Sequence, residues 1–448
     1  MSFQIALSGL DAASTSLEVT SNNIANSRTN GFKEARAEFG DVFATSINDS
    51  SATAPGRGVR VNKIAQQFSQ GTVDFTSRNL DLAINGDGFF VLQGDDGGIE
   101  YTRAGAYSSD KDGFIVNHKL QKLQVYPAVT VNGVTSFTTG VLRDLQLPLA
   151  NSAPNQTLDV TTAINLDAAA VPPASPFQAA PASQAAVNAA VTAGTIYIPG
   201  ADEYNYSTST TVYDSLGDSH TLSMYFIQTG TPNEWSVQTL IDGYDVTNTT
   251  TAPANTSGNA IQNNLLVFDS TGALDPAASG AMEIYNATFG GALPLGQSAA
   301  TSQDGIRYTI ADMTQYGGDY AVSNIVQDGF ATGRLAGLDI DAEGVAFARY
   351  TNGQATALGK VALAKFNSPQ NLSKVGDTNW AESFASGQAL LGEATTSSFG
   401  SIQSGALEAS NVDLAEQLVN LIVSQRAFQA NSKVVTSVDQ ILQTIINI

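Results

Sequence analysis

Few residues in this 448-residue chain have the types and spacing that chemistry requires. The two histidines, His118 and His220, have no second histidine or cysteine at a metal-binding spacing. Both lie in polar, strand-like segments, so we interpret them as surface side chains. The chain contains no cysteine, which excludes disulfides, thiol nucleophiles and thiolate metal ligands.

One segment, Asp339 to Gly344, resembles the start of a calcium-binding loop, with acidic residues at 339, 341 and 343. Such a loop requires a bidentate Glu at its twelfth position, which Tyr350 occupies, and flanking helices that the pattern does not predict. Gly86 and Gly88 lack the third glycine and the following helix of a dinucleotide motif. We therefore predict no metal site and no cofactor.

The acidic composition excludes other classes of function. With 41 Asp and Glu residues, some carboxylate pair could always be nominated as a hydrolase acid and base, so such a pair is no evidence for catalysis. We predict no catalytic residue and no enzyme activity. A formal net charge of -21 would repel nucleic-acid phosphates and anionic lipids. No apolar stretch is long enough to span a bilayer, so we expect neither nucleic-acid binding nor membrane insertion.

Both ends of the chain carry the alternating three- and four-residue apolar spacing of a coiled-coil seam. The first helix should end in the Asn-rich run around Asn22 and Asn26, because Asn favours turns over helix interiors. Ser410 to Asp413 matches a capping box and predicts the start of a long second helix. Its apolar stripe is wider than one partner helix can cover.

The simplest interpretation of an amphipathic helix is that it packs onto a globular core. The terminal positions of these two helices instead favour pairing with each other. The surplus apolar surface would then pack against other copies, and a contact of this kind that does not close produces a helical filament. The large apolar seam positions, which we also expect at the polymer interface, are Phe3, Leu7, Leu10, Leu17, Ile24, Leu414, Leu418, Leu421, Phe428, Val435 and Leu442. Leu418 in particular should lie on the seam between the two terminal helices.

Between the ends, short β-prone runs alternate with Asn-Gly and Asp-Gly pairs, which are typical of hairpin turns. Leu80–Ile84 and Phe89–Leu92 predict two strands joined by a tight turn, and a second turn is expected at Asp112-Gly113. An Ala- and Pro-rich stretch near 168–191 predicts an irregular surface insertion whose role the sequence does not reveal. The expected fold class is α+β, with long terminal helices pairing as a coiled coil and two mostly β central domains.

Three long segments resemble the flagellar rod and hook family of axial proteins: LSGLDAASTSLEVTSNNIANSRTNGFKEARAEF, NLDLAINGDGFFVL and SGALEASNVDLAEQLVNLIVSQRAFQANSKVVTSVDQILQTI. The run ANSRTNGFK looks like the signature of that family after the first helix. It comprises Ala25, Asn26, Ser27, Thr29, Asn30, Gly31, Phe32 and Lys33, together with Arg28. The length of the central region resembles that of a hook subunit.

The resemblance implies three domains and a structural role. Residues 1–70 and 400–448 would form a helical inner-tube domain, residues 71–145 and 325–399 an inner β domain, and residues 146–324 an outer β domain. The subunit would polymerise with itself into a curved flexible tube that joins rod to filament and transmits torque. Implied partners are the distal rod, hook cap and hook-filament junction proteins.

The same resemblance implies an extracellular location in the flagellar hook and export by the flagellar type III apparatus without a cleaved signal peptide. The N-terminal segment indeed lacks the basic and apolar regions of a secretory signal. Two alternatives stay open: a distal rod protein of the same family, and a secreted β-rich adhesin or hydrolase. The last would need an aromatic sugar-binding cleft, for which Trp235 and Trp380 are the only tryptophans.

Overall fold

The computed structural model describes residues 2–42, 56–131, 134–177, 198–245, 265–275, 279, 283–284, 306–309, 312–396 and 398–446. It divides into two compact units. The first comprises residues 1–149, 335–350 and 354–448, and the second comprises residues 150–334 and 351–353. Helices lie at both ends of the chain with strands between them, which confirms the predicted α+β class.

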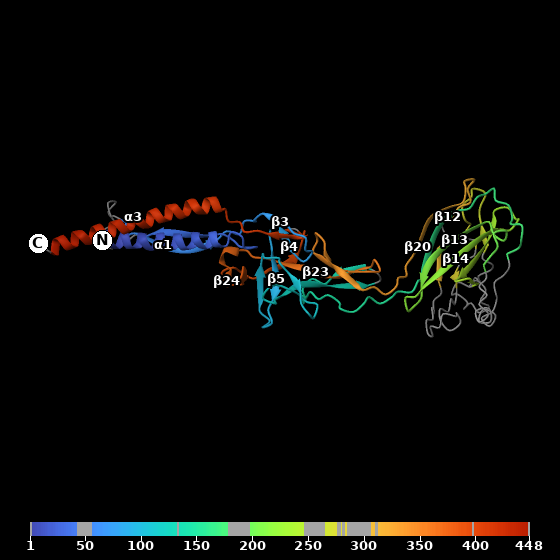
Figure 1. Ribbon diagram of the computed structural model, residues 1–448, viewed down its shortest axis with the longest axis horizontal. Helices are drawn as coiled ribbons and strands as arrows, with labels where there is room; N and C mark the ends of the chain where they lie inside the picture. Colours follow the sequence, from blue (N-terminus) through green and yellow to red (C-terminus); the bar gives the residue numbers. More distant parts are fainter. Residues whose placement is uncertain are drawn as a thin grey trace. The chain divides into compact units, whose positions relative to one another are not determined.

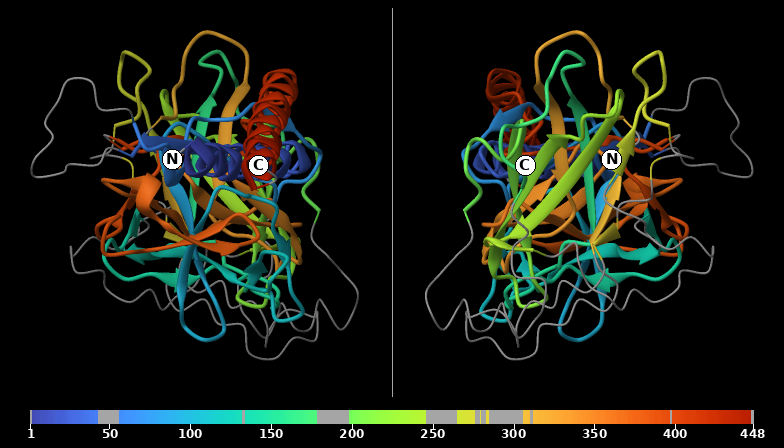
Figure 2. Two further views of the ribbon diagram at one scale, coloured as in Figure 1. Left: turned by 90° about the vertical axis from the view of Figure 1, so that its left-hand side faces the viewer. Right: turned by 90° about the vertical axis from the view of Figure 1, so that its right-hand side faces the viewer.

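Two long helices, α1 (Ser2–Ala25) and α3 (Leu414–Ile446), belong to the first unit and lie side by side in Figures 1 and 2. They run antiparallel, because α1 leads into the strands and α3 returns from them. As expected, α1 ends in the Asn-rich segment, where the side-chain amide of Asn26 donates to the carbonyl of Asn22. No helix in the described part of the chain is both long and apolar enough to cross a membrane.

The predicted capping box is wrong in detail. Asp413, and not Ser410, caps α3: its Oδ1 accepts hydrogen bonds from the backbone amides of Ala415 and Glu416 at 2.8 and 3.3 Å. The Ser410 hydroxyl instead accepts from Val412 N. The helix therefore begins after Asp413, whose carboxylate satisfies two amides that have no partner within the helix.

The first unit is built around one large sheet, with 13 strands among the described residues, and three two-stranded sheets. The strands of this unit are β1 (Ala35–Asp41), β2 (Val59–Gln66), β3 (Val73–Phe75), β4 (Leu82–Asn85), β5 (Phe89–Gln93), β6 (Ile99–Thr102), β7 (Ser108–Ser109), β8 (Ile115–Val116), β9 (Lys122–Val131), β10 (Val134–Phe137), β11 (Arg143–Asp144), β21 (Leu335–Ile340), β22 (Val345–Tyr350), β23 (Ala355–Lys365), β24 (Ser373–Gly376), β25 (Asn379–Ala381), β26 (Leu390–Glu393), β27 (Ser401–Ser404) and β28 (Ala406–Glu408), with a 3-10 turn at Pro369–Asn371.

The centre of this sheet is buried on both faces, which explains its continuous apolar runs. In β5, Phe90 and Leu92 belong to one core cluster, whereas Phe89 and Val91 belong to another. Strands β9 and β23 also contribute side chains to both clusters. A strand with alternate residues in two cores must be apolar at every position, as the sequence Phe-Phe-Val-Leu is.

The predicted hairpin between Leu80–Ile84 and Phe89–Leu92 is wrong. Strand β4 pairs with β27, near the C-terminus, whereas β5 pairs with β6, β9 and β23. The intervening Gly86 and Gly88 have positive φ of 114° and 137°, so they redirect the chain between sheets instead of closing a turn. The turn at Asp112-Gly113, by contrast, is confirmed by the pairing of β7 with β8.

In its described residues, the second unit forms two sheets around one core, and the strands there are β12 (Asp159–Asn165), β13 (Tyr206–Tyr213), β14 (Ser219–Gln228), β15 (Glu234–Ile241), β16 (Tyr244–Asp245), β17 (Leu265–Val267), β18 (Glu283–Ile284), β19 (Ile306–Thr309) and β20 (Ala321–Gln327). Burial alternates along β12, β14 and β15, with Phe226 and Trp235 fully inside. Part of the Ala- and Pro-rich stretch, 178–191, lies outside the described residues.

The interpretation of His220 as a surface residue is wrong. His220 is 5% exposed, and its Nδ1 donates to Asp242 Oδ2 at 2.6 Å, while its Nε2 lies 3.9 Å from Asp214 Oδ2. Its position in the alternating pattern of β14 puts it on the inward side of the strand. A polar side chain can occupy that side because the two carboxylates compensate its lost hydration. His118 is exposed.

Candidate assembly interface

Small and polar side chains form the contact between α1 and α3 at three successive heptad positions. Asn23 Nδ2 donates to Gln417 Oε1 at 3.1 Å, and the hydroxyls of Ser16 and Ser424 are 2.8 Å apart. Asn431 packs on Gly9, where an added Cβ would lie 2.9 Å from its amide. Each seven-residue step along α1 matches a seven-residue step in the opposite direction along α3, so the two helices pair in a defined register.

The first of these pairs is tied to the neighbouring sheet. Asn23 also donates to the carbonyl of Ala35 and accepts from its amide, at 2.8 and 2.9 Å. Gln417 Nε2 donates to Glu34 Oε1 at 2.9 Å. Burial raises the pKa of the Glu34 carboxyl despite this hydrogen bond. The amides of Asn23 and Gln417 are buried at 1% and 3% exposure, and their contacts satisfy the polar atoms that burial would otherwise penalise.

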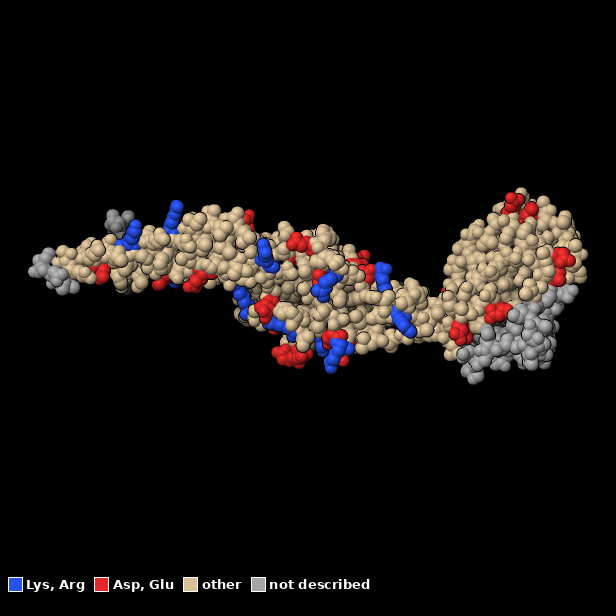
Figure 3. Space-filling model, viewed as in Figure 1, with Lys and Arg blue, Asp and Glu red and all other residues tan. Residues whose placement is uncertain are grey.

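Large apolar side chains lie on the outside of the same helices. Leu418, Val419, Ile422 and Val423 are 50%, 59%, 49% and 59% exposed on the first turns of α3. Phe3, Ile5 and Leu7 are similarly exposed on α1. Figure 3 shows that few charged residues interrupt the helices on the face in view. The helix pair therefore buries small side chains internally and exposes large apolar ones, the reverse of an isolated coiled coil.

This arrangement corrects the expected seam between the helices. Leu414 and Leu418, expected between the helices, are 43% and 50% exposed, and Phe3 and Leu7 are exposed as well. The other predicted positions, Leu10, Leu17, Ile24, Leu421, Phe428 and Val435, are partly buried, and the side chain of Leu442 lies outside the described residues. The α1–α3 contact instead uses residues one position away in the pattern, such as Gln417 and Ser424. An equally regular repeat of small and polar residues at 9, 16, 23 and at 417, 424, 431 could have revealed it.

An open groove of about 700 Å³ lies beside the helix pair. Its walls come from α1, the start of α3 and β1, and they include Asn23, Glu34, Phe39, Gln417 and Val423. The lining mixes amides, carboxylates and apolar side chains. It is a surface on which a protein segment could pack, and it provides no grouping of catalytic residues.

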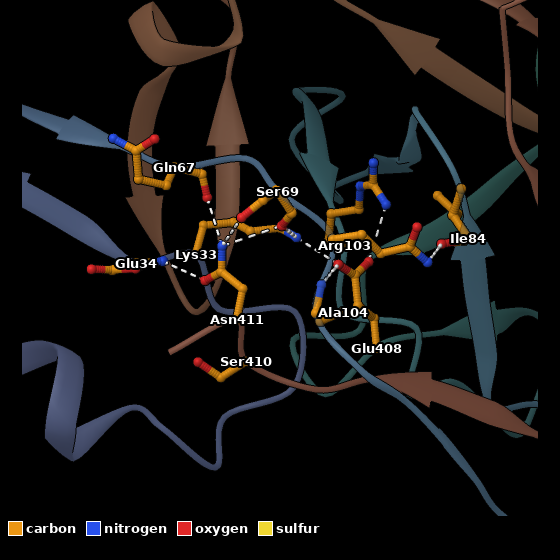
Figure 4. A network of polar contacts seen from close by, with 12 residues as sticks. Lys33, Glu34, Gln67, Ser69, Ile84, Arg103, Ala104, Glu408, Ser410 and Asn411 are labelled. Carbon is orange, nitrogen blue, oxygen red and sulfur yellow. Dashed lines mark hydrogen bonds and ion pairs between the residues drawn. The ribbon is translucent and has the colours of Figure 1, made fainter. Parts of the chain in front are cut away.

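Where the terminal helices meet the strands, three charged side chains are buried together (Figure 4). Glu408 on β28 pairs with Lys33 at 2.5 Å and with Arg103 at 3.0 Å, and its side chain and that of Lys33 are fully buried. Lys33 also donates to the carbonyl of Ser69, and Gly71 N donates to Glu408. Burial lowers the pKa of the Lys33 amine, although Glu408 opposes that shift. The network joins the segment after α1 to the segment before α3.

Asn411 makes a second connection at this junction. Its Oδ1 accepts from Glu34 N at 2.7 Å, while its Nδ2 donates to Gln67 O at 2.9 Å (Figure 4). Sequence reasoning missed Glu408, Arg103 and Asn411. Their partners are hundreds of positions away or in loops, so no local periodicity indicates them.

The segment Ala25 to Lys33, singled out by the resemblance, forms the turn between α1 and this junction. Thr29 Oγ1 donates to Asn26 Oδ1, and Gly31 N donates to the carbonyl of Glu408 at 2.7 Å. Gly31 has φ of +71°, and an added Cβ would lie 2.5 Å from Ala104 N. Only glycine fits this position. Ser27, Asn30 and Phe32 complete the turn, which brings Lys33 into its buried site.

The remaining candidate sites do not assemble. In the segment that resembled a calcium loop, Asp341 Oδ1 accepts from Glu343 N and Val345 N within the β21–β22 turn, and Asp339 pairs with Arg349. Trp235 and Trp380 are 0% and 2% exposed, so neither can line a sugar-binding cleft. Within the described ranges, no three His, Cys, Asp or Glu side chains cluster to hold a metal ion.

Comparison with known families accounts for both ends and the middle of the chain. Residues 3–33 match the flagella basal body rod protein family, and residues 403–448 match the flagellar basal body rod FlgEFG protein C-terminal family. Residues 83–153 match the flagellar hook protein FlgE/F/G D1 domain, and residues 165–330 match the flagellar basal body protein FlaE D2 domain.

The chain is also similar to curated proteins along its whole length. It is 36% identical over 452 residues to the flagellar hook protein FlgE of Salmonella typhimurium, covering 100% of both chains. The chain belongs to the flagellar hook protein family. The flagellar hook protein FlgE of Escherichia coli K12 is likewise 36% identical over 449 residues, with 100% of both chains covered. This family is structural and not enzymatic.

Among solved structures, the crystal structure of the Helicobacter pylori flagellar hook protein FlgE2 is similar to 75% of this chain and 100% of its own, with 16% identity and a TM-score of 0.47. The two terminal family matches cover all of α3 and all of α1 except Ser2, together with the turn that carries Lys33. Asn23, Lys33, Glu408 and Gln417 thus lie in the segments that relate this chain to rod and hook proteins.

Proposed function

We propose that the chain is the structural subunit of the bacterial flagellar hook and that its terminal helices form the polymer interface. The carrying observation is the exposure of Leu418, Val419, Ile422 and Val423 on a helix whose contact with α1 is small and polar. An apolar surface of this kind favours burial, and a second copy of the same chain supplies a matching surface. Repetition of a contact that does not close builds a tube.

The proposal assigns each of the three domains a position in the tube. Residues 1–70 and 400–448 would line the tube, residues 71–145 and 325–399 would surround them, and residues 146–324 would lie outermost. The tube would be curved and flexible, would join the rod to the filament and would transmit torque. The family match and the low number of charged residues on the two helices support this role.

The finer partners also belong to this proposal: the distal rod, hook cap and hook-filament junction proteins, and the flagellar type III export apparatus. The subunit would reach the hook, outside the cell, without a cleaved signal peptide. Full-length similarity to proteins that are themselves named hook proteins favours this role over that of a distal rod protein. The buried tryptophans argue against an adhesin that binds sugars.

The test is polymerisation of the purified chain, followed by light scattering and negative-stain microscopy, in the parent and in Leu418→Asp. Burying a leucine contributes about 1.5 to 3 kcal/mol, and an unpaired carboxylate in its place adds several more, so the variant should form no tubes. Curved tubes from the parent support a hook subunit, straight rods would support a rod protein, and a parent that stays monomeric would refute the polymer role.

Two controls accompany Leu418→Asp. Glu416→Asp keeps the charge on the same helix and should polymerise as the parent does. Thr231→Asp adds one negative charge at an exposed position in the second unit, far in sequence from the helices. It should also polymerise, which would separate the loss of apolar surface from the added charge. Unchanged tube formation by Leu418→Asp would remove that residue from the interface.

A further inference from the structure

We propose that Gln417 is the residue that sets the register of α3 on α1, through its buried hydrogen bonds to Asn23 and Glu34. The inference rests on the proposed polymer role, because it explains how every subunit would present the same apolar surface. It assigns the polar side of the helix pair to contacts within one chain and the apolar side to contacts between chains.

Gln417 has both ends of its amide occupied. Its Oε1 accepts from Asn23 Nδ2, and its Nε2 donates to Glu34 Oε1. Asn23 belongs to α1, and Glu34 directly precedes β1. Both are fixed by further hydrogen bonds: Asn23 bonds the backbone of Ala35, and the Glu34 backbone amide donates to Asn411. A Gln that is 3% exposed finds both partners at only one position of α3. Leaving a buried amide without them is costly.

A slip of α3 by one heptad would remove this match. Ser424 would then face Asn23, and Asn431 would face Ser16 instead of Gly9. At Gly9 an added Cβ would already lie 2.9 Å from the Asn431 amide, so Asn431 fits against glycine and is crowded by a larger residue. Apolar heptads alone do not distinguish such slips, whereas a buried polar pair specifies one register.

Register matters in a polymer of identical subunits. A one-heptad slip moves α3 by about 10 Å along α1, at 1.5 Å for each residue. Leu418 and Ile422 would move by that distance relative to Phe3 and Leu7 on α1. Subunits in different registers would present different apolar surfaces and could not repeat one contact.

Engineered disulfides can measure the register, because the chain has no cysteine of its own. Ser16→Cys/Ser424→Cys joins two side chains whose oxygens are 2.8 Å apart and reports the observed register. Ser16→Cys/Asn431→Cys reports a one-heptad slip and retains Gln417. In assembled chains that carry no other substitution, the first cysteine pair should form the intrachain disulfide about tenfold more than the second, as expected for the loss of one buried, hydrogen-bonded amide.

The deciding variant is Gln417→Met, which keeps the length of the side chain and removes its amide. It should lower the preference for the 16–424 disulfide to about that for the 16–431 disulfide. Glu34→Ala is a second variant that removes the acceptor of the Gln417 side-chain NH2 group and should lower the same preference; it serves if Gln417→Met does not assemble. Asn431→Leu leaves Gln417 and its two partners intact, so it should form the 16–424 disulfide as the parent does.

The outcomes separate the two proposals. An unchanged tenfold preference in Gln417→Met tubes, or loss of the 16–424 disulfide in Asn431→Leu tubes, would overturn the assignment of the register to Gln417 and leave the polymer role intact. Disulfides that form only between chains would overturn it as well. Failure of the unmodified parent to polymerise would refute the proposed function itself.

Discussion

Glu408 Oε1 lies 2.5 Å from Lys33 Nζ, and neither side chain is exposed to solvent. The two residues are 375 positions apart in the sequence. Their contact joins the segment that follows α1 to the segment that precedes α3, and Arg103 shares the same carboxylate. The ends of the chain are therefore fixed to the β-sheet by a buried charge network as well as by apolar packing.

We predict that Glu408→Gln destabilises the first unit by about 3 to 5 kcal/mol, because it leaves Lys33 and Arg103 buried without their counter-charge. Lys33→Met should cost less, since Glu408 keeps Arg103 as a partner. Thermal and urea unfolding followed by circular dichroism measure both effects.

The matched control for this network is the exposed pair of Lys365 and Asp87, whose side chains are 34% and 71% exposed. Lys365→Met should cost about 0 to 1 kcal/mol, as expected for a surface ion pair. A cost for Glu408→Gln no larger than that of Lys365→Met would show that the buried network contributes little.

Truncation at the C-terminal end tests where the β region ends. We predict that a fragment of residues 71–409 folds, whereas a fragment of residues 71–400 is much less stable. The shorter fragment loses β27, the partner of β4, and removes Ile402 and Ala406 from the core, where they are 2% and 0% exposed. Loss of such side chains costs several kcal/mol. Limited proteolysis and circular dichroism compare the two, and equal protection of both fragments would contradict the prediction.

The contrast between β4 and α3 shows what the sequence could reveal. Heptad spacing identified α3, and the Asp112-Gly113 pair identified the turn between β7 and β8, because these signals arise from local geometry. The pairing of β4 with β27 could not be predicted, since an Asn-Gly pair beside two apolar runs is equally typical of a hairpin. Long-range pairing depends on which core each face joins, and that information is distributed over the whole chain.

The helix contact shows the same limit on a finer scale. Apolar spacing placed Leu418 between α1 and α3, because in an isolated pair the largest apolar side chains are buried. In this chain Gln417 and Ser424 occupy that contact and Leu418 is half exposed. A sequence that must bind both itself and its neighbours carries two stripes, and apolar periodicity alone does not say which stripe faces inward.

His220 provides a pH-dependent prediction for the second unit. The hydrogen bond to Asp242 is the largest cause that raises the pKa of His220, and the charges of Asp242, Asp214 and Asp218 add to it, while burial opposes it. Because the folded-state pKa exceeds the unfolded value of about 6.5, this stabilisation is fully present below that value and is lost as pH rises through the folded pKa.

The Asp242 carboxyl determines how far the pH can fall before the stabilisation by the His220–Asp242 pair is lost. Burial alone would raise its pKa, but hydrogen bonds from His220 and Thr221 and the charge of His220 outweigh burial and lower it. Its contribution is present above about 3.8 and is lost as pH falls through the folded value. We predict that His220→Gln lowers stability by about 1.5 to 3 kcal/mol near pH 5.5 and by less near pH 8.5, measured by thermal unfolding. An equal loss at both pH values would contradict a charged His220–Asp242 pair.

The net charge of -21 makes polymerisation dependent on salt. Helices α1 and α3 carry few charges, Asp11, Glu18, Glu416, Arg426, Lys433 and Asp439, so most of the repulsion between copies comes from the β-rich units. Raising the salt concentration from about 10 to 150 mM shortens the screening length from about 30 to 8 Å, while apolar burial between helices is not weakened. Polymerisation, followed by light scattering, should therefore become faster.

Leu418→Asp should not be rescued by the same salt, because its defect is the burial of a charge and not repulsion at long range. Slower growth of the parent at the higher salt concentration would instead indicate that specific ion pairs between subunits dominate the assembly.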